Sequence, residues 1–148
     1  MAALAQLNIA RMKVAEDDPV FAPFLEMLDP VNQTAEASPG FRWRLVSGED
    51  DCPELAAHEA DGWLVNMSLW DSLESLQAFI RSPKHLSVMR RRKEWFSDVE
   101  VHLVLWWLPE GETPTFTDAM RRLEQLRAQG PSPEAFDFRH VYPAPAGA

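Results

Sequence analysis

Thiol chemistry is almost absent from this chain, which has one cysteine, Cys52, in 148 residues. A single cysteine excludes an internal disulfide, and it excludes a thiolate cluster that could hold zinc or an iron–sulfur centre. The neighbours of Cys52 in "EDDCPE" are acidic and disfavour the thiolate form, so we interpret it as an unreactive loop residue. The fold must therefore rest on its hydrophobic core.

Long apolar runs are missing too. None approaches the roughly 18 residues that a membrane-spanning helix needs. The first segment, "MAALAQLNIARMKV", has no basic start, and Gln6 and Asn8 interrupt its apolar residues, so it matches neither a signal peptide nor an anchor. The sequence therefore predicts a cytoplasmic protein with no membrane partner.

Basic residues are scarce, because 14 Lys and Arg stand against 23 Asp and Glu, for a formal net charge of −9. This balance disfavours nucleic-acid binding, which requires a basic field over a whole face. The spacings of P-loops, dinucleotide-binding glycine loops, HExxH zinc sites and Ser-His-Asp triads are absent as well. We therefore expect no nucleic-acid partner, no metal ligands and no cofactor.

Hydrophobic residues, in contrast, make up 46% of the chain and include six Trp and eight Phe. This content is typical of a folded globular protein and well above that of disordered chains. The length suits one core. We predict a single domain over residues 1–140, followed by a disordered tail, "VYPAPAGA", over residues 141–148.

Hydrophobic periodicity predicts the order of strands and helices. Strands are predicted at residues 4–12, 41–46, 62–70 and 99–109. Helices are predicted at residues 17–38 with an interruption or a kink around Pro30, at residues 72–96 with a restart at Pro83, and at residues 113–130, whereas residues 47–61 are expected to form a polar loop. This order predicts a ferredoxin-like α+β fold, in which a four-stranded antiparallel sheet carries helices on one face and a C-terminal helix is added.

The helix-free face of such a sheet would expose a large apolar surface. We assign to it Trp63, Val65, Met67, Leu103, Leu105 and Trp107. Exposed apolar surfaces of more than a few hundred Å² are rare on monomers. A second copy of the same sheet would cover this one, so we predict a face-to-face homodimer.

Several segments resemble those of a known bacterial family. They are "WDSLESLQAFIRSPKHLSVMRRRKEWF" and "VLWWLPEGETPTFTDAMRRLEQLRAQGPSPEAFDFR", together with "LAQLNIARM" and "SPGFRWRL", and they are similar to the family called domain of unknown function 3291 over about residues 4–139. That family is similar to the dimeric α/β barrel superfamily, which includes antibiotic-biosynthesis monooxygenases, haem-degrading monooxygenases and polyketide cyclases. The resemblance implies a dimeric α/β barrel with a ligand between helices and sheet.

The resemblance also raises haem as an alternative ligand. A haem-degrading relative uses a helical histidine to bind iron, and His85 is a helical histidine here. By spacing, however, the place of that ligand falls near Met89. A haem protein with His85 as axial ligand therefore stays open beside a protein without a cofactor.

The segment "SPKHLSVMRRRKEWF", residues 82–96, places several side chains on one helical face. They are His85, Val88, Met89, Arg92, Trp95 and Phe96. In one interpretation the apolar members pack on the sheet, while His85 and Arg92 satisfy carbonyls or pair with a carboxylate. In the other, His85 and Arg92 project into a small-molecule pocket.

The pocket would be walled by a polar face of the sheet, with Asn8, Asn66, Ser68 and His102. An unpaired buried amide costs about 1–3 kcal/mol, so the two asparagines favour a bound polar ligand or water. The predicted ligand-binding set is completed by Met89, Phe96 and three tryptophans that could stack on an aromatic substrate, namely Trp70, Trp95 and Trp106.

His85 and Arg92 are the candidate catalytic residues. The pKa of a histidine lies near neutrality, so His85 could be a general base, and Arg92 could bind a carboxylate or an enolate oxygen. The sequence thus predicts a small-molecule-binding protein that acts on an aromatic or polyketide-like substrate as a cofactor-independent monooxygenase or a cyclase-like enzyme. The alternatives are the haem protein and a non-catalytic dimeric binding module.

Overall fold

The computed structural model describes residues 2–46, 52–97 and 102–145. Its elements are β1 (Ala3–Met12), the 3-10 turn η1 (Pro19–Phe21), α1 (Ala22–Ala37), β2 (Phe41–Arg44), α2 (Pro53–Ala60), β3 (Trp63–Trp70), α3 (Leu73–Ile80), α4 (Pro83–Trp95), β4 (Phe96–Ser97), β5 (Leu103–Leu108) and α5 (Phe116–Gln129).

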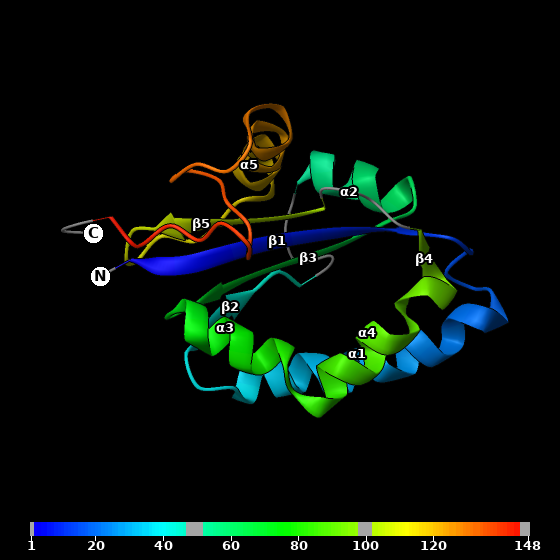
Figure 1. Ribbon diagram of the computed structural model, residues 1–148. Helices are drawn as coiled ribbons and strands as arrows, with labels where there is room; N and C mark the ends of the chain where they lie inside the picture. The colour runs from blue at the N-terminus through cyan, green and yellow to red at the C-terminus, as the bar shows by residue number, and fades with distance from the viewer. Residues whose placement is uncertain (1, 47–51, 98–101, 146–148) are drawn as a thin grey trace.

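The strands form one antiparallel sheet in which β1 is central. Its neighbours are β3, which also pairs with β2, and β4 and β5, which pair with different parts of β1. Helices α1, α3 and α4 lie on one side of the sheet, and α2 and α5 lie on the other (Figure 1). The predicted ferredoxin-like α+β fold is confirmed.

Short polar side chains begin three of the helical segments. Asp18 accepts a hydrogen bond from the backbone of Val20 at the start of η1, and Ser72 accepts one from Ser75 at the start of α3. Thr115 caps α5 in the same way. Such caps satisfy amide groups that have no partner inside the helix. The starts of these helices were therefore readable from the sequence.

An interruption or a kink was predicted around Pro30, and the interruption is wrong, because α1 continues through Pro30 to Ala37. A proline inside a helix removes one backbone hydrogen bond, here the one to the carbonyl of Glu26. Glu26 is exposed, so water can satisfy that carbonyl. The proline still costs the helix about 3 kcal/mol, which the packing of α1 must offset.

The predicted polar loop over residues 47–61 is also wrong in part, since residues 53–60 form α2. Residues 47–51 lie outside the described residues. Leu55 is 2% exposed and packs with the sheet core, and Cys52 stands at the start of the helix. One buried leucine is too little to show an apolar face in the sequence, which is why the helix was missed.

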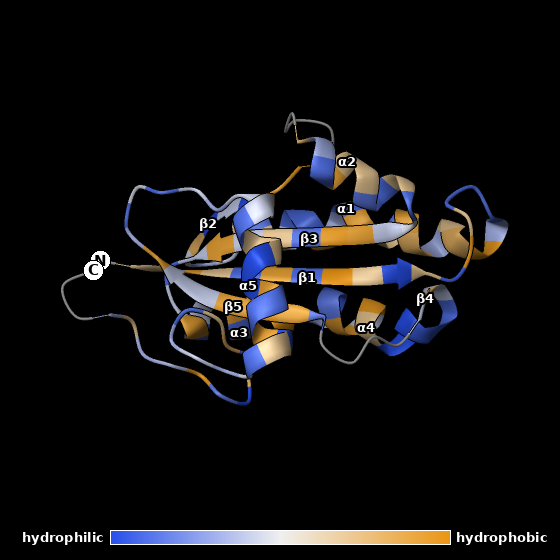
Figure 2. Cartoon of the chain, turned by 90° about the horizontal axis from the view of Figure 1, so that it is seen from above, coloured by the Kyte–Doolittle hydropathy of each residue, from blue (hydrophilic) through white to orange (hydrophobic). Residues whose placement is uncertain are grey.

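The sheet face predicted to be free of helices is covered by this chain's own α5 and α2. Figure 2 shows α5 crossing over the strands. The buried side chains of α5 are Phe116, Ala119, Leu123 and Leu126, and they share one core with alternate residues of β1, β3 and β5. The reason given for a face-to-face dimer, an uncovered apolar face, is therefore wrong.

The predicted orientation of β5 is also wrong, because Leu103, Leu105 and Trp107 point to the side of the sheet opposite to the one predicted. Leu7 lies opposite Met67 on one side and Val104 on the other, so these three residues point to the α5 side. Leu105 belongs to the core on the side of α1, α3 and α4, where Leu103 and Trp107 pack too. Both faces of β5 are apolar, so its sequence could not show which face points where.

The C-terminal segment returns to the sheet. The carbonyl of Tyr142 accepts a hydrogen bond of 2.8 Å from Nε1 of Trp107. The ring of Tyr142 lies 5.8 Å from that of Phe136. Residues 141–145 have no regular secondary structure, and residues 146–148 of the predicted tail lie outside the described residues.

Candidate functional site

The sheet face toward α1, α3 and α4 has a polar middle between two apolar ends. Leu4 and Trp70 belong to an apolar cluster at one end, and Met12 and Leu64 to another at the opposite end. Between them, β1 and β3 present Gln6, Asn8, Asn66 and Ser68, which pair across the strands. Four polar side chains here interrupt a layer that would otherwise be a continuous core; we call them the polar floor.

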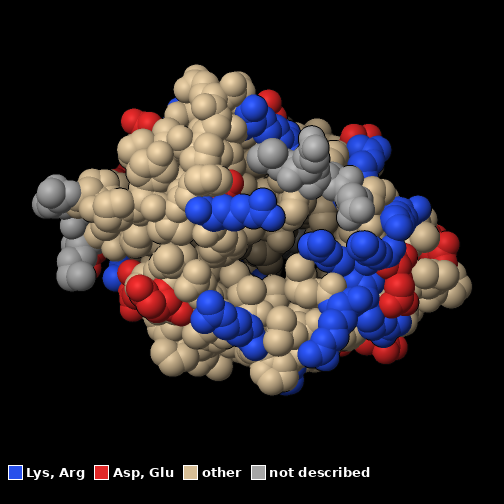
Figure 3. Space-filling model, in the orientation of Figure 1, with Lys and Arg blue, Asp and Glu red and all other residues tan. Residues whose placement is uncertain are grey.

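The polar floor is open to solvent. Asn66 faces the helix layer from β3, yet it is exposed, so no helix covers it there. Figure 3 shows a hollow between the sheet and α4, with Lys and Arg side chains around it. A cleft therefore reaches the polar floor between the sheet and α4.

Gln6 organises the polar floor. It is 6% exposed, and its Nε2 donates to Oδ1 of Asn66 at 2.6 Å and to Oγ of Ser68 at 2.8 Å. Ser68 Oγ also accepts a 2.8 Å hydrogen bond from Nε1 of Trp70. These bonds cross from one strand to its neighbour, so they hold the floor in a fixed arrangement.

Four buried polar atoms around the cleft have no hydrogen-bond partner. They are Asn8 Oδ1, Arg44 Nε, Ser82 Oγ and His85 Nδ1. Each such atom costs about 1–3 kcal/mol if it stays unpaired. Most buried polar groups in folded proteins have partners, and unpaired ones concentrate where a ligand or water binds. Each of them is therefore a place where a water molecule or a ligand atom would be favourable.

Arg44 reaches the polar floor from β2. It pairs with Ser68 across β2 and β3, so both side chains lie on the same sheet face. Glu36 of α1 forms an ion pair with Arg44 at 3.5 Å, but the geometry leaves Nε without a hydrogen bond. The guanidinium is partly charge-balanced and still has a donor to offer.

His85 stands at the apolar end of the cleft. Its ring lies 5.1 Å from that of Phe79, in an edge-on arrangement, and Phe79 stacks on Trp70 at 5.3 Å. Burial lowers the pKa of His85, and a hydrogen bond with the backbone of Ile80 raises it by a smaller amount. The imidazole is therefore neutral at pH 7, and a neutral imidazole can accept a proton.

Acidification is expected to weaken the wild-type fold more than that of a His85→Asn variant. Because the pKa of His85 is lower in the folded chain, the unfolded chain binds more protons below its ordinary value of 6.5. The free energy of unfolding should not depend on this group above that pH, and it should fall as the pH drops through 6.5 toward the lowered folded pKa. Urea unfolding of both proteins at about pH 8 and about pH 5 measures this difference. Equal losses in both proteins would contradict it.

The structure brings together part of the predicted site. Asn8, Asn66 and Ser68 lie on the polar floor, and His85 lies at the end of the cleft. Trp70 is fully buried beneath Phe79 and supports His85 from below. On α4, Met89 is 37% exposed and Arg92 is exposed.

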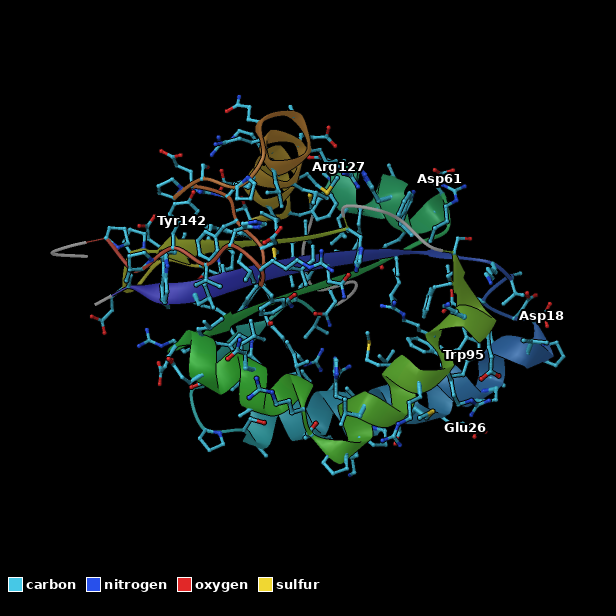
Figure 4. The ribbon with its side chains drawn as sticks, viewed as in Figure 1. Asp18, Glu26, Asp61, Trp95, Arg127 and Tyr142 are labelled. Carbon is cyan, nitrogen blue, oxygen red and sulfur yellow. The ribbon has the colours of Figure 1, made fainter. Side chains whose placement is uncertain are left out.

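Other predicted residues lie elsewhere. Trp95 and Phe96 belong to the apolar cluster at the far end of α4, where Trp95 Nε1 donates to the carbonyl of Val20 (Figure 4). Trp106 is fully buried on the α5 side of the sheet, with the Arg122 guanidinium 5.4 Å from its ring. His102 precedes β5, and the alternation of that strand places it on the side of Trp106. His102 and Trp106 therefore do not share the cleft with Asn8.

Sequence reasoning missed Gln6 and Arg44. The position of Gln6 was visible, because it alternates with Leu4 and Asn8 along β1 and so shares their face. Arg44 could not be assigned in the same way, since its place opposite Ser68 depends on a bulge between Phe41 and Trp43.

Two surface depressions are lined mostly by other parts of the chain, although one of them shares Arg44 with the cleft. One, of about 340 Å³, is lined by residues 43–46 and 113–115, and another, of about 180 Å³, by Gln77, Ile80, Arg81 and Phe138. Neither contains a histidine or a carboxylate, so they are poorer candidates for acid–base chemistry than the cleft.

Within the described ranges, no group of three or more His, Cys, Asp and Glu is placed to hold a metal ion. Among these same residues, no helix has both the length and the apolar character to cross a membrane.

Solved structures with the same fold cover most of this chain. A conserved protein from Methanosarcina mazei Go1 has a TM-score of 0.52 and 17% identity, with 72% of this chain and 92% of that protein covered. A protein of unknown function from Nitrosomonas europaea has a TM-score of 0.52 and 14% identity, with 78% and 97% covered. At these identities the likeness shows the fold alone.

A cofactor-independent oxygenase, SnoaB from Streptomyces nogalater, is also similar, with a TM-score of 0.48, 14% identity, and 76% of this chain and 97% of that protein covered. With a TM-score below 0.5, this likeness has no weight for the chemistry of the chain.

No curated protein sequence matches this chain significantly. A family model, in contrast, matches residues 3–148, nearly the whole sequence, and confirms the predicted family. The chain belongs to the family described as domain of unknown function (DUF3291).

Proposed function

We propose that the chain binds a small aromatic or polyketide-like molecule in the cleft and that His85 removes a proton from it, without a metal. The observation that carries this proposal is His85 itself, a partly buried imidazole whose Nδ1 has no partner beside an open polar floor. A general base must be unprotonated and within reach of the proton that it removes. The lowered pKa of His85 and its position at the end of the cleft support it in this role.

The polar floor would support this step. When His85 takes a proton from a carbon next to a carbonyl, the carbon–hydrogen electron pair moves into the ligand, and negative charge develops on the carbonyl oxygen. The hydroxyl of Ser68 is a donor that would stabilise that charge, because its oxygen already accepts two hydrogen bonds and its hydrogen remains to be donated. An enolate of this kind reacts with dioxygen in a cofactor-independent oxygenation, or attacks a second carbonyl in a cyclisation. Arg92 keeps its predicted role as a second anion-binding residue.

Haem does not fit this cleft. The edge of the Phe79 ring already occupies one side of the His85 imidazole, at 5.1 Å between ring centres. The floor beside it is a hydrogen-bonded polar network rather than the flat apolar surface that a porphyrin would need. A homodimer stays a prediction, without the uncovered sheet face that motivated it.

Replacing His85 with alanine is expected to slow proton removal from an enolisable aromatic ketone. Anthrone is a suitable probe, because deuterium exchange at its acidic carbon, followed by proton NMR in heavy water, reports proton removal directly. We expect the wild type to accelerate the exchange and His85→Ala to lose about tenfold or more of that acceleration, since general-base catalysis typically contributes about 10²–10⁴-fold.

His140→Ala is the matched control. His140 is an exposed histidine that pairs with Asp137 at 3.0 Å, so its loss should leave the exchange unchanged. Anthrone binding without acceleration would favour the non-catalytic binding module. An acceleration that survives in His85→Ala would remove His85 from the proposal.

A further inference from the structure

The hydrogen bonds within the polar floor determine which of its groups remain available as donors to a ligand. Both Nε2 hydrogens of Gln6 are used, one by Asn66 Oδ1 and one by Ser68 Oγ. The Asn66 amide is thereby oriented with its oxygen toward Gln6, which leaves its Nδ2 group to donate elsewhere. Ser68 Oγ accepts from Gln6 and from Trp70, so both lone pairs are used and its own hydrogen remains to be donated. The floor therefore offers donors.

Arg44 adds a charged donor to this set. Its Nε is buried on the same face as Ser68 and forms a long ion pair with Glu36, but it makes no hydrogen bond. The only acidic side chain paired with Arg44 among the described residues is Glu36, at 3.5 Å and half exposed. A charge-assisted hydrogen bond to a carboxylate is roughly twice as strong as a neutral one. The unused donor is thus best matched by an anionic oxygen.

The charge around the mouth of the cleft has the same sign. Helix α4 carries Lys84, Arg90, Arg91, Arg92 and Lys93, against one acidic residue, Glu94. Lys and Arg side chains surround the hollow in Figure 3, although the chain as a whole is acidic. A local basic field raises the concentration of anions at the mouth of a cleft.

One acceptor faces these donors from the other side of the floor. Asn8 Oδ1 is buried without a partner on β1, and β3 separates it from Arg44 on β2. Asn8 lies opposite Asn66 and Arg44 opposite Ser68, so the two positions are two strand spacings apart across the sheet and two residues apart along it. With about 4.8 Å between strands and about 3.3 Å per residue, they are roughly 12 Å apart. A ligand that satisfies both atoms needs an anionic oxygen at one end and an O–H donor at the other, at a separation that suits two fused aromatic rings.

We infer that the ligand of the cleft is a hydroxylated carboxylic acid with an enolisable, largely aromatic system of about two fused rings, bound with its carboxylate at Arg44 and its hydroxyl at Asn8. This inference rests on the proposed function, since it names the substrate class of the same cleft. Before proton transfer His85 is neutral, so the carboxylate of the ligand pairs with Arg44 and the imidazole remains available as the base.

Four related compounds test the inference by isothermal titration of the intact chain. They are 6-hydroxy-2-naphthoate, its neutral methyl ester, 2-naphthoate without the hydroxyl, and the neutral methyl 2-naphthoate. We expect the hydroxy acid to bind about tenfold or more tightly than its ester, which corresponds to about 1.4 kcal/mol. It should also bind more tightly than 2-naphthoate.

Two variants test which residue binds the carboxylate of the ligand and which binds its hydroxyl. Arg44→Met should abolish the preference for acid over ester and keep the preference for the hydroxyl, and Asn8→Leu should do the reverse. Arg121→Met is the matched control, because it removes the same charge from an exposed side chain of α5, on the opposite side of the sheet.

Equal binding of the acid and the ester, or an acid preference that survives in Arg44→Met, would overturn this inference and leave the proposed function standing. If no compound binds, the proposed function fails, and the inference fails with it. A loss of the acid preference in Arg121→Met as large as in Arg44→Met would show a long-range charge effect, and it too would overturn the assignment.

Discussion

Trp70→Ala is expected to destabilise the domain by about 3–5 kcal/mol, the usual cost of truncating a fully buried tryptophan. Trp70 is 0% exposed, stacks on Phe79 at 5.3 Å and meets Phe41 edge-on at 5.4 Å. Its Nε1 also holds Ser68 in the polar floor. The truncation would leave a cavity beneath Phe79 and Ser68, so it should weaken both the core and the support of His85.

Urea unfolding followed by circular dichroism measures this loss. Trp70→Phe should cost an intermediate amount, because it keeps one ring in the core but removes the rest of the buried indole and the hydrogen bond to Ser68, which is worth about 1 kcal/mol. Trp63→Ala, a partly exposed tryptophan at the start of the same strand, should cost clearly less. A Trp70→Ala variant as stable as Trp63→Ala would show that the cluster around Trp70 is not packed as described.

Leu123→Asp is expected to cost more than about 3 kcal/mol, because removing a buried leucine side chain alone costs about 2–5 kcal/mol and the new carboxylate must also lose its hydration. Leu123 is 0% exposed at the centre of the contact between α5 and the sheet. If α5 leaves the sheet, the apolar face of β1, β3 and β5 becomes exposed. We therefore expect a lower urea midpoint together with self-association in light scattering.

The neighbouring residue supplies the control for this prediction. Glu124 is exposed, so Glu124→Gln should change the free energy of unfolding by no more than about 0.5 kcal/mol and leave the scattering unchanged. A Leu123→Asp variant with the wild-type midpoint would mean that α5 does not cover its own sheet. The face would then again be free for a second copy, as the sequence had predicted.

Much of the fold follows from local sequence patterns. The alternation in "LAQLNIARM" and "GWLVNMSLW" predicts β1 and β3 within about one residue, because a half-buried strand must place its apolar side chains on one face. Asp18, Ser72 and Thr115 mark the starts of helical segments, because only short polar side chains can reach the unpaired amides there. The same alternation put Asn8, Asn66 and Ser68 on one face of the sheet.

The orientation of β5 and the position of α5 depend on contacts between segments that are far apart in the sequence. The register between β5 and β1, in which Leu7 pairs with Val104, decides which side chains of β5 point to which side of the sheet. Because β5 is apolar on both sides, its sequence does not show this orientation. The cover of the other sheet face by α5 depends on where the chain turns after β5, so the sequence could equally well predict a dimer there.

The sequence by itself determined the ferredoxin-like class, the strands β1 and β3 and three of the four polar residues of the cleft floor, because each follows from side chains that are close together along one strand or helix. Only the tertiary structure decided which of the candidate residues meet. It placed Arg44 on the same face as Ser68, His85 against Phe79 at the apolar end of the cleft and Trp106 on the opposite side of the sheet, because strand register and helix packing fix these distances through contacts far apart in sequence.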